Sequence, residues 1–370
     1  MSAIRSFVRR EPVLFIAALA ALLTSFFVPP DSRYLAYLDL RTLSLLYCLM
    51  TVVNGLRQAG LFSHLAHSLC ITAANLRTIA LLLVGLCFFT SMLITNDVAL
   101  LTFVPFAVVV MGLAHHQKEL IHVVVLQTVA ANLGSMLTPV GNPQNLYLYS
   151  FYDMGFGEFL RVTAPVWGVS LVLLFLLCLL FKADHLDVFL GEAPGMERGP
   201  ILLHSALFVL CLLVVLRVIP WYVMLLLIVA VLLVSDRRLL LKADFMLLLT
   251  FVAFFIFSGN LARIESVSSA IRRLMAGREY LASLLTSQVI SNVTAALLLS
   301  GFTSKSHALL LGVNVGGLGT PIASLASLIS LKLYSHSEHA SPARFLAEFL
   351  AVNVALILLL SLVAVWELPG

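Results

Sequence analysis

Asn132-Leu133-Gly134-Ser135-Met136-Leu137-Thr138-Pro139 is matched later in the chain by Asn314-Val315-Gly316-Gly317-Leu318-Gly319-Thr320-Pro321. Each stretch interrupts an apolar segment and is preceded by a second polar interruption, Thr95-Asn96-Asp97 in one case and Ser291-Asn292-Val293 in the other. Hydrocarbon offers no hydrogen-bond partners, so unwound backbone at membrane depth persists only where protein or a water-filled cavity satisfies its polar groups. Secondary transporters place their substrates at paired helix breaks of this kind. The pattern therefore indicates a membrane protein with a transported substrate.

The composition restricts the chain to one class of protein. Of its 370 residues 61% are hydrophobic and 11% are charged, and the mean hydropathy is +1.06. Soluble domains are typically about 45–50% apolar, so we predict a polytopic protein surrounded by a lipid bilayer. The formal net charge of +4 does not indicate a nucleic-acid partner, because the Lys and Arg residues lie at the ends of apolar runs, where they orient helices. The cysteines, odd in number and without metal-ligand spacing, are expected to be small core residues. They are Cys48, Cys70, Cys87, Cys178 and Cys211.

The predicted fold is an all-α polytopic membrane protein with an inverted structural repeat, two re-entrant hairpins, two broken transmembrane helices and about nine full spans. A spanning helix needs about 20 apolar residues. The unbroken candidates are residues 12–30, 40–57, 160–181, 201–217, 219–235, 242–259 and 345–366. The stretches 78–151 and 281–334 are apolar but interrupted, and each predicts a hairpin with its tip at Asn96 or Asn292, followed by a helix that breaks.

The two halves are expected to cross the membrane in opposite directions. If a hairpin contributes no crossing, the number of crossings from span 40–57 to span 242–259 is odd. The tip and break asparagines are 36 positions apart in the first half and 22 in the second, so the second hairpin limb and the helix after it are expected to be shorter. The expected organisation is an N-terminal span at 1–39, a first repeat at 40–181 with its tip near 95–97 and its break near 132–145, a linker with two spans at 182–241, and a second repeat at 242–370 with its tip near 291–293 and its break near 314–327.

Basic residues predict the orientation of the chain. With the N-terminus in the cytoplasm, most of them fall on the cytoplasmic side, as the positive-inside rule prefers. They are Arg5, Arg9, Arg10, Arg57, Arg77, Lys118, Lys182, Arg198, Arg237, Arg238 and Lys242. Four others would lie outside, on an amphipathic segment expected to run along the lipid headgroups. These are Arg263, Arg272, Arg273 and Arg278.

The helix breaks suit two kinds of ligand. The N–H groups at the N-terminal ends of half-helices carry partial positive charge and suit an anion, whereas carbonyl groups at the C-terminal ends suit a cation. The residues expected to contact the substrate are Thr95, Asn96, Ser291, Asn292, Thr138, Asn142, Asn145 and Thr320. The residues expected to hold a coupling cation are Asn96, Asp97, Gly134, Ser135, Asn292, Gly316 and Gly317. We expect sodium or a proton as the coupling ion, no other metal and no cofactor.

Each interruption also has a simpler interpretation. Polar residues and glycines in transmembrane helices often serve only helix packing, although four breaks in matching order in two halves favour a functional site. Asp97 is the most informative residue, because an ionisable side chain at membrane depth is costly and usually functional. It could bind sodium or carry a proton, or it could only cap the second hairpin limb. Its counterpart in the second half is Val293.

Together, these motifs resemble the ion transporter superfamily that includes divalent-anion/sodium symporters, citrate transporters and arsenite permeases. The resemblance covers most of the chain from about residue 40. In the dicarboxylate branch a Ser-Asn-Thr triplet at both hairpin tips binds carboxylate and sodium, whereas the triplets here are Thr-Asn-Asp and Ser-Asn-Val. The Asn-Asp pair and the run from Gly141 to Asn145 are more similar to the citrate-transporter-like and arsenite-permease branch. The resemblance implies a compact bacterial inner-membrane member that works by alternating access and forms a homodimer.

The leading hypothesis is a secondary transporter of a small anion or oxyanion, such as a di- or tricarboxylate or an arsenite-like species, coupled to sodium or protons. One alternative is a sodium/proton antiporter in which Asp97 exchanges the ions. A more remote alternative is a membrane-embedded enzyme, which we do not expect because the sequence has no zinc-protease helix motif, no paired intramembrane aspartates and no nucleophile elbow.

Overall fold

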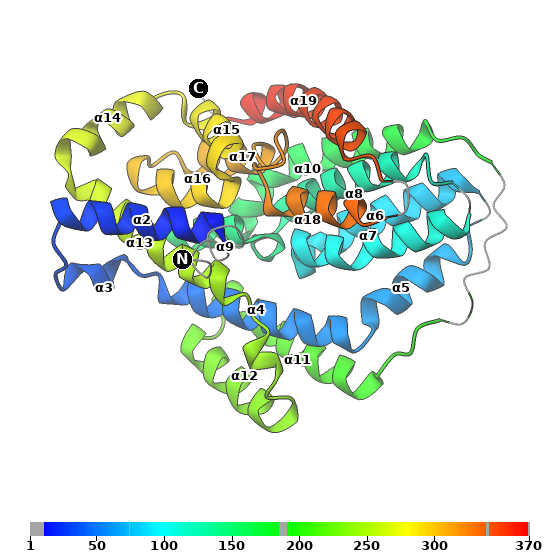
Figure 1. The fold of residues 1–370 in the computed structure, drawn as a ribbon. Helices are drawn as coiled ribbons and strands as arrows, with labels where there is room; N and C mark the ends of the chain where they lie inside the picture. The colour runs from blue at the N-terminus through cyan, green and yellow to red at the C-terminus, as the bar shows by residue number, and fades with distance from the viewer. Residues whose placement is uncertain are drawn as a thin grey trace, which may run out of the picture.

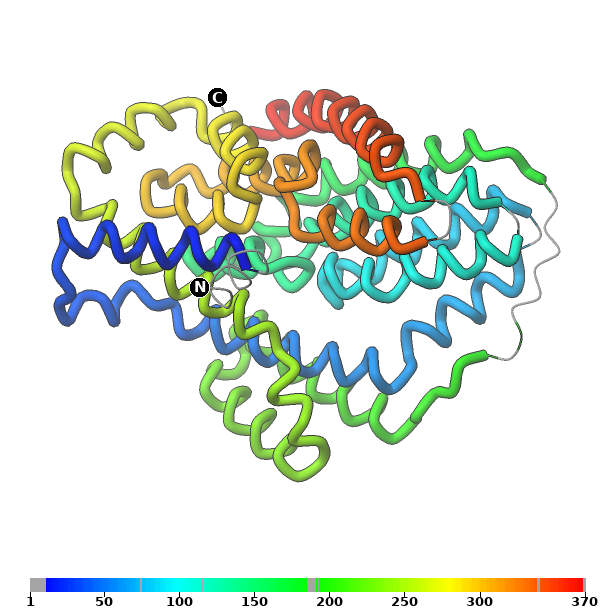
Figure 2. The backbone as a smooth tube through the Cα atoms, in the orientation of Figure 1, coloured from blue at the N-terminus to red at the C-terminus, as the bar shows by residue number. Residues whose placement is uncertain are grey.

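The structure is a computed structural model that describes residues 11–73, 75–114, 116–184, 191, 193–337 and 340–368. The regular elements within these ranges are helices, which confirms the prediction of an all-α protein. Figure 2 shows them as an elongated bundle. Arg5, Arg9 and Arg10, on which the predicted orientation partly depends, lie outside the described residues.

Two sets of helices have their elements in the same order. Each set has a long helix, an amphipathic helix, the two limbs of a hairpin, the two halves of a broken helix and a final long helix. The first set is α4 (Leu40–Gln58), α5 (Leu61–Cys70), α6 (Leu76–Ile94), α7 (Asn96–Leu113), α8 (Leu120–Gly134), η1 (Ser135–Leu137), η2 (Pro139–Gly141), α9 (Pro143–Phe151) and α10 (Phe156–Leu179). The second set is α13 (Phe245–Arg263), α14 (Glu265–Met275), α15 (Glu279–Ile290), α16 (Asn292–Leu299), η4 (Ser300–Phe302), α17 (Ser306–Val315), α18 (Leu325–Ser335) and α19 (Pro342–Glu367). As the spacing predicted, α16 and α17 are shorter than α7 and α8.

The other helices of the described residues come before the first set or lie between the two sets in the chain. They are α2 (Pro12–Phe27), α3 (Arg33–Tyr37), α11 (Arg198–Val215), α12 (Trp221–Ser235) and η3 (Leu239–Leu241). α2 precedes the first set but packs along α13 of the second, and α11 precedes the second set but packs along α4 of the first. Buried Asn260 of α13 donates a hydrogen bond to the Tyr34 hydroxyl of α3 (2.9 Å). The long helix that opens each set is therefore covered by a helix that precedes the other set.

The two hairpins lie toward opposite ends of the molecule. In Figure 1, α6 and α7 lie in the right half of the view, and α15 and α16 lie in the left half. The first limbs pack against their own set, α6 against α8 and α15 against α17. The second limbs cross over, because α7 packs against α18 and α16 packs against α9. The second limb of each hairpin thus contacts the second half of the other set's broken helix.

The first hairpin enters and leaves at one end of the bundle. At its base, Arg77 Nε donates to the carbonyl group of Phe181, just after the end of α10 (2.8 Å). At the other end of the hairpin, Thr163 within α10 donates to the carbonyl group of Leu137 in the first break (3.2 Å). Because α10 begins at Phe156, it continues beyond the level of the hairpin tip. The tip therefore ends part of the way along the bundle.

Seven of the described helices are long and apolar enough to cross a membrane, or eight if the bent pair α4 and α5 forms one span. The seven include the hairpin limbs α6 and α7 and leave out α2 and α12, which have 16 and 15 residues. The sequence analysis arrived at about nine spans because it counted these two short helices and the two broken helices, and did not count the hairpin limbs. On either count the chain is a multi-pass membrane protein.

Glycines let the first limbs approach the broken helices closely. A Cβ atom on Gly134 would lie 2.0 Å from the carbonyl oxygen of Phe88 in α6, and one on Gly312 would lie 2.5 Å from the carbonyl oxygen of Tyr280 in α15. Helices in lipid associate largely through van der Waals packing, which small interface residues allow. Because these neighbours are backbone atoms, they cannot turn aside as the end of a side chain can.

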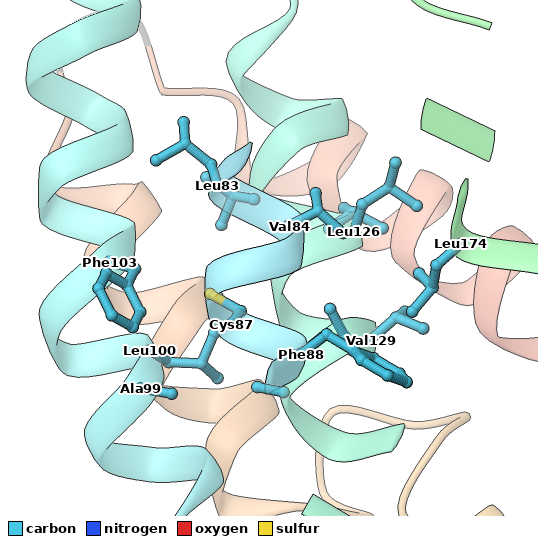
Figure 3. Packing of buried hydrophobic residues seen from close by; sticks show 14 of the residues in the cluster. Leu83, Val84, Cys87, Phe88, Ala99, Leu100, Phe103, Leu126, Val129 and Leu174 are labelled. Carbon is cyan, nitrogen blue, oxygen red and sulfur yellow. The ribbon is translucent and has the colours of Figure 1, made fainter. Parts of the chain in front are cut away.

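A core of apolar side chains joins α6, α7, α8 and α10, as Figure 3 shows. Cys87 and Phe88 from α6 lie there with Phe103 from α7, Val129 from α8 and Leu174 from α10. All five cysteines of the chain are buried and free, which agrees with their predicted place in the core. The limbs of the first hairpin are thus held by apolar packing against α8 and α10.

The substitution Gly134→Ala tests the close approach of α8 to α6. The added methyl group would meet backbone, and such overpacking costs about 1–3 kcal/mol. We expect a lower apparent melting temperature for the purified protein in detergent. Gly85→Ala on α6 is the matched control, because no other atom lies within 4 Å of its added Cβ. Equal melting temperatures for the two variants would contradict this packing.

Candidate functional site

The two hairpin tips have the same unusual backbone. Thr95 has φ 72° and ψ 149°, and Ser291 has φ 75° and ψ 154°. Glycine is nearly the only residue that adopts this region without strain, and a residue with a side chain there costs about 1–3 kcal/mol. Such strain persists only where the surroundings support it, and it is concentrated at functional sites. The shared geometry therefore marks both tips as candidate parts of a site.

The asparagine after each strained residue fastens the tip to a break. The Oδ1 atoms of Asn96 and Asn292 accept hydrogen bonds from the next backbone N–H group, at 3.0 and 2.9 Å. Asn96 Nδ2 donates to Asn132 Oδ1 at the first break (3.0 Å). The backbone N–H group of Asn292 donates to the carbonyl group of Ala323, just after the second break (2.8 Å). Both asparagines are buried.

Asn132, at the end of α8, joins the first break to the second. Its Oδ1 atom accepts a hydrogen bond from Ser324 Oγ (2.9 Å), and its Nδ2 atom donates to Ser327 Oγ (3.4 Å). All three side chains are buried. Because Ser324 and Ser327 begin α18, the end of one half-helix is fixed to the start of a half-helix from the other set.

Asn314, at the end of α17, makes the corresponding contacts in the other direction. Its Nδ2 atom donates to Asn145 Oδ1 (2.7 Å), and its Oδ1 atom accepts from Asn142 Nδ2 (3.4 Å). These six residues form three pairs in which the partners are 182 positions apart: Asn132 and Asn314, Asn142 and Ser324, and Asn145 and Ser327. The polar residues of each motif copy therefore form hydrogen bonds with residues of the other copy.

The threonine of each break is bonded to the hairpin of its own set. Thr138 Oγ1 donates to the carbonyl group of Met92, and Thr320 Oγ1 donates to the carbonyl group of Gln288 (2.9 Å). Met92 and Gln288 each stand four positions before the tip asparagine. Thr138 and Thr320 were predicted to contact the substrate. In the structure, their hydroxyl groups donate to the hairpins and fix the breaks in place.

The residues predicted to hold a cation have several roles in the structure. Ser135 Oγ donates to the carbonyl group of Asn132 (2.9 Å) and accepts from Asn142 Nδ2 (3.0 Å). Gly134 permits the close packing described above. A Cβ atom on Gly317 would lie 2.6 Å from Asn292 Nδ2, so the glycine makes room for the tip asparagine. The carbonyl group of Gly316 accepts a hydrogen bond from Gln288 Nε2 (2.8 Å).

A cavity of about 240 Å³ opens beside the first hairpin tip. Among the predicted site residues, Thr95, Asp97 and Asn142 line it. Ser291, Asn292 and Thr320 of the second half do not. The other lining residues are Leu46, Leu49, Met50, Val53, Asn54, Ile94, Val98, Leu101, Val140, Pro143, Leu146, Lys242, Asp244, Leu247, Leu325 and Ile329. The cavity thus has mostly aliphatic walls, with polar groups from the first tip, the first break and the start of α13.

The charged groups of the cavity differ in their surroundings. Asp97 Oδ1 is buried and has no hydrogen-bond partner among the described residues. Lys242 and Asp244 are exposed, so they lie where the cavity opens. Lys242 Nζ donates to Gln58 Oε1 (2.7 Å), and Asp244 Oδ1 accepts from the N–H group of Leu247 as the N-cap of α13 (2.9 Å). Asp97 therefore has a buried carboxylate oxygen that is free to accept a proton or to hold a cation or a hydroxyl group of a ligand.

Sequence reasoning missed several residues of this region. Asn54, Lys242 and Asp244 belong to segments far from the polar interruptions, and Gln288 stands within a hairpin limb. Ser324 and Ser327 carried a usable signal, because the constant spacing of 182 positions pairs them with Asn142 and Asn145.

Comparison with known proteins shows the family of the chain. A family profile described as citrate transporter, CitMHS, matches residues 2–306. The chain is 34% identical over 299 residues to the uncharacterized transporter MJ0456 of Methanocaldococcus jannaschii, which covers 79% of this chain and 80% of that protein. It is 31% identical over 316 residues to the inner membrane protein YbiR of Escherichia coli K12, which covers 84% of each chain.

A similarity to a plant protein is more limited. The chain is 32% identical over 157 residues to the silicon efflux transporter LSI3 of Oryza sativa subsp. japonica, which covers 42% of this chain and 32% of that protein. The names of the family, of MJ0456 and of LSI3 describe transporters and not enzymes. The resemblance to the ion transporter superfamily and its citrate-transporter branch is confirmed by the family match. The chain is a multi-pass membrane transporter, and it belongs to the citrate transporter family.

Proposed function

We propose that the protein is a secondary active transporter that moves a small anion or oxyanion by alternating access, coupled to sodium or protons. The observation that carries this proposal is the junction of both strained hairpin tips and both helix breaks in one buried polar network beside a cavity. A purely structural helix bundle has no need of four backbone interruptions at one place, because each one removes helical hydrogen bonds in lipid.

Helix N-termini support an anionic or oxyanionic substrate. The first residues of α7, α9 and α18 lie at the cavity, which Asp97, Pro143 and Leu325 line. N-terminal N–H groups carry partial positive charge and favour anions. An ionised Asp97 would oppose an anion bound there, and a sodium ion or a proton on this carboxylate would remove that repulsion. The geometry thus provides a physical reason for coupling the substrate to a cation.

The packing of the helices supports movement of one part against another. We propose that the hairpins and broken helices form the transport unit and that α2, α3, α4, α11, α12 and α13 form the scaffold, with the two sets of helices as inverted repeats. In this proposal the cation changes the affinity for substrate because both ligands shift the same conformational equilibrium. We further propose a homodimer with its N-terminus in the cytoplasm, in a bacterial inner membrane like that of the E. coli relative.

The relatives supply substrates to test. The description of the family names citrate, and the name of the plant relative refers to silicon efflux. Both groups of compounds carry oxygen atoms that hydroxyl, amide and helix N-terminal N–H groups can bind. A test panel therefore contains citrate, succinate, sulfate, arsenite and silicic acid.

A sodium/proton antiporter is the second candidate. The buried Asp97 Oδ1 without a hydrogen-bond partner favours it, because a carboxylate at membrane depth that is free to change partners can exchange a proton for sodium. In that case the cavity would conduct ions and would bind no oxyanion.

The double substitution Asn96→Ala with Asn292→Ala tests the position of the site. We expect gradient-driven uptake of the substrate in proteoliposomes to fall at least about tenfold, which corresponds to about 1.4 kcal/mol in the transition state. The matched control is Asn75→Ala, which removes the N-cap of α6 at the base of the same hairpin. Uptake that is lost equally in the control would indicate a general folding defect and would contradict a site at the tips.

Asp97→Asn separates the two candidates. In an anion transporter the amide keeps the cavity polar, so substrate binding should persist while its dependence on sodium or pH weakens. In an antiporter sodium-driven pH change should be lost entirely. Asp236→Asn, at the end of α12, is the control and should leave both readouts unchanged. Full, cation-dependent transport by the Asp97 variant would contradict a role for this carboxylate in coupling.

A further inference from the structure

The two helix breaks differ in what satisfies their backbone carbonyl groups. At an interrupted helix these groups lose their intrahelical partners, and in transporters such carbonyl groups coordinate sodium or accept other donors. In the second break the donor is a side chain of the hairpin limb α15. Gln288 Nε2 donates to the carbonyl groups of Gly316 (2.8 Å) and Leu318 (3.1 Å) in the break, and it also lies 3.2 Å from the carbonyl oxygen of Leu284 in its own helix.

Both the nitrogen and the oxygen atom of the Gln288 side-chain amide make hydrogen bonds. Its Oε1 atom accepts a hydrogen bond from the backbone N–H group of Thr320 (2.9 Å), and the Gln288 carbonyl group accepts from the hydroxyl group of the same threonine (2.9 Å). A Cβ atom on Gly319 would lie 2.1 Å from Oε1, and Gly319 has a φ of 99°. The loop of the second break is therefore shaped around this amide group.

The first break has no counterpart of this amide on its hairpin. Met92 takes the position of Gln288, four residues before the tip asparagine, and its thioether has no N–H group to donate. The carbonyl groups of Ser135, Met136 and Thr138 accept from Asn145 Nδ2 at 3.2 to 3.4 Å, which are long hydrogen bonds, and that of Thr138 also accepts from the N–H group of Gly141 (3.3 Å). Beside this break lies Asp97, whose Oδ1 atom has no described partner.

The second half has nothing equivalent to that carboxylate. Val293 takes the position of Asp97 after the tip asparagine, and Gly317 takes the position of Ser135 in the break. A cation at the second break would therefore find no carboxylate from the residue after the tip asparagine and no hydroxyl group at the position of Ser135. It would also find the Gly316 and Leu318 carbonyl groups occupied by an N–H donor.

We propose that the Gln288 amide takes the place of a coupling cation at the second break, so that each chain has at most one coupling-cation position, at Asp97 in the first half. Its two N–H groups present partial positive charge to two carbonyl oxygens, as a bound cation would. The second hairpin and its break are then held together at every sodium concentration. The statement about coupling rests on the proposed transport function, whereas the occupancy of the second break by the amide does not.

The test is the number of sodium ions bound by purified protein, measured with radioactive sodium at pH 8. We expect wild type to bind no more than one ion per chain. Gln288→Glu replaces the N–H donor by an oxygen that repels the two carbonyl oxygens, and a cation between them relieves the repulsion. This variant should gain one sodium ion per chain, and the gain should persist when Asp97→Asn is added. Gln58→Glu, which adds the same charge at the exposed end of α4, should gain none.

A second variant covers the case in which Gln288→Glu does not fold. Gln288→Ala removes the donor, so its apparent melting temperature should be lower than that of wild type and should recover with sodium chloride more than with choline chloride. Two sodium ions bound by wild type, no gain in Gln288→Glu, or equal effects of both salts on Gln288→Ala would overturn the proposal. Because these measurements count ions and not transport, a failure of the proposed function would be seen separately, as absent uptake.

Discussion

The structure is governed by one requirement: the backbone N–H and carbonyl groups at the interrupted helices need hydrogen-bond partners inside the membrane. An interrupted helix leaves carbonyl and N–H groups without partners, and lipid supplies none. Here side chains donate to the free carbonyl groups of each break, Asn145 at the first and Gln288 at the second. Side chains of the two breaks are also bonded to each other across the two sets of helices, Asn132 with Ser324 and Asn314 with Asn145. Neither break could keep its present contacts without the other. This reciprocal dependence brings the two sets together at one site.

The packing of the other helices holds this junction together. Glycines allow each first limb to lie against its broken helix, and the second limbs cross over to the other set. The helices before each set cover the other set, which leaves the hairpins and broken helices as one unit beside α4 and α13. The strained backbone at Thr95 and Ser291 is supported by the bonds of the next residue to the breaks. A cavity lies between this unit and α4, and the proposed transport function assigns the solute to it.

The sequence predicted the helical membrane fold, the order of the interruptions and the family, because these depend on composition and on motifs that can be read locally. It predicted Asn96 as a site residue and placed Asn132 at the start of the first break, but it did not predict that they bond to each other. The contact of Asn132 with Ser324 joins residues that are far apart in the chain, so only the tertiary structure reveals it. Thr138 was predicted to contact substrate, and its hydroxyl group is bonded to the carbonyl group of Met92. Gln288 was missed because a glutamine within a hairpin limb has no local pattern that indicates its partners.

The most direct test of the junction is a double-mutant cycle on Asn145 and Asn314, measured as thermal unfolding of the purified protein in detergent. Residues that share a hydrogen-bond network typically show coupling of about 0.5–3 kcal/mol. The reciprocal junction predicts that the double alanine variant unfolds at about the same temperature as the less stable of the two single variants. Asn260→Ala should add independently to Asn145→Ala, because the Asn260 amide bonds to Thr24 and Tyr34 and not to the breaks. If the effects of Asn145→Ala and Asn314→Ala were also additive, the two breaks would not depend on each other, and the account of a single joined site would be wrong.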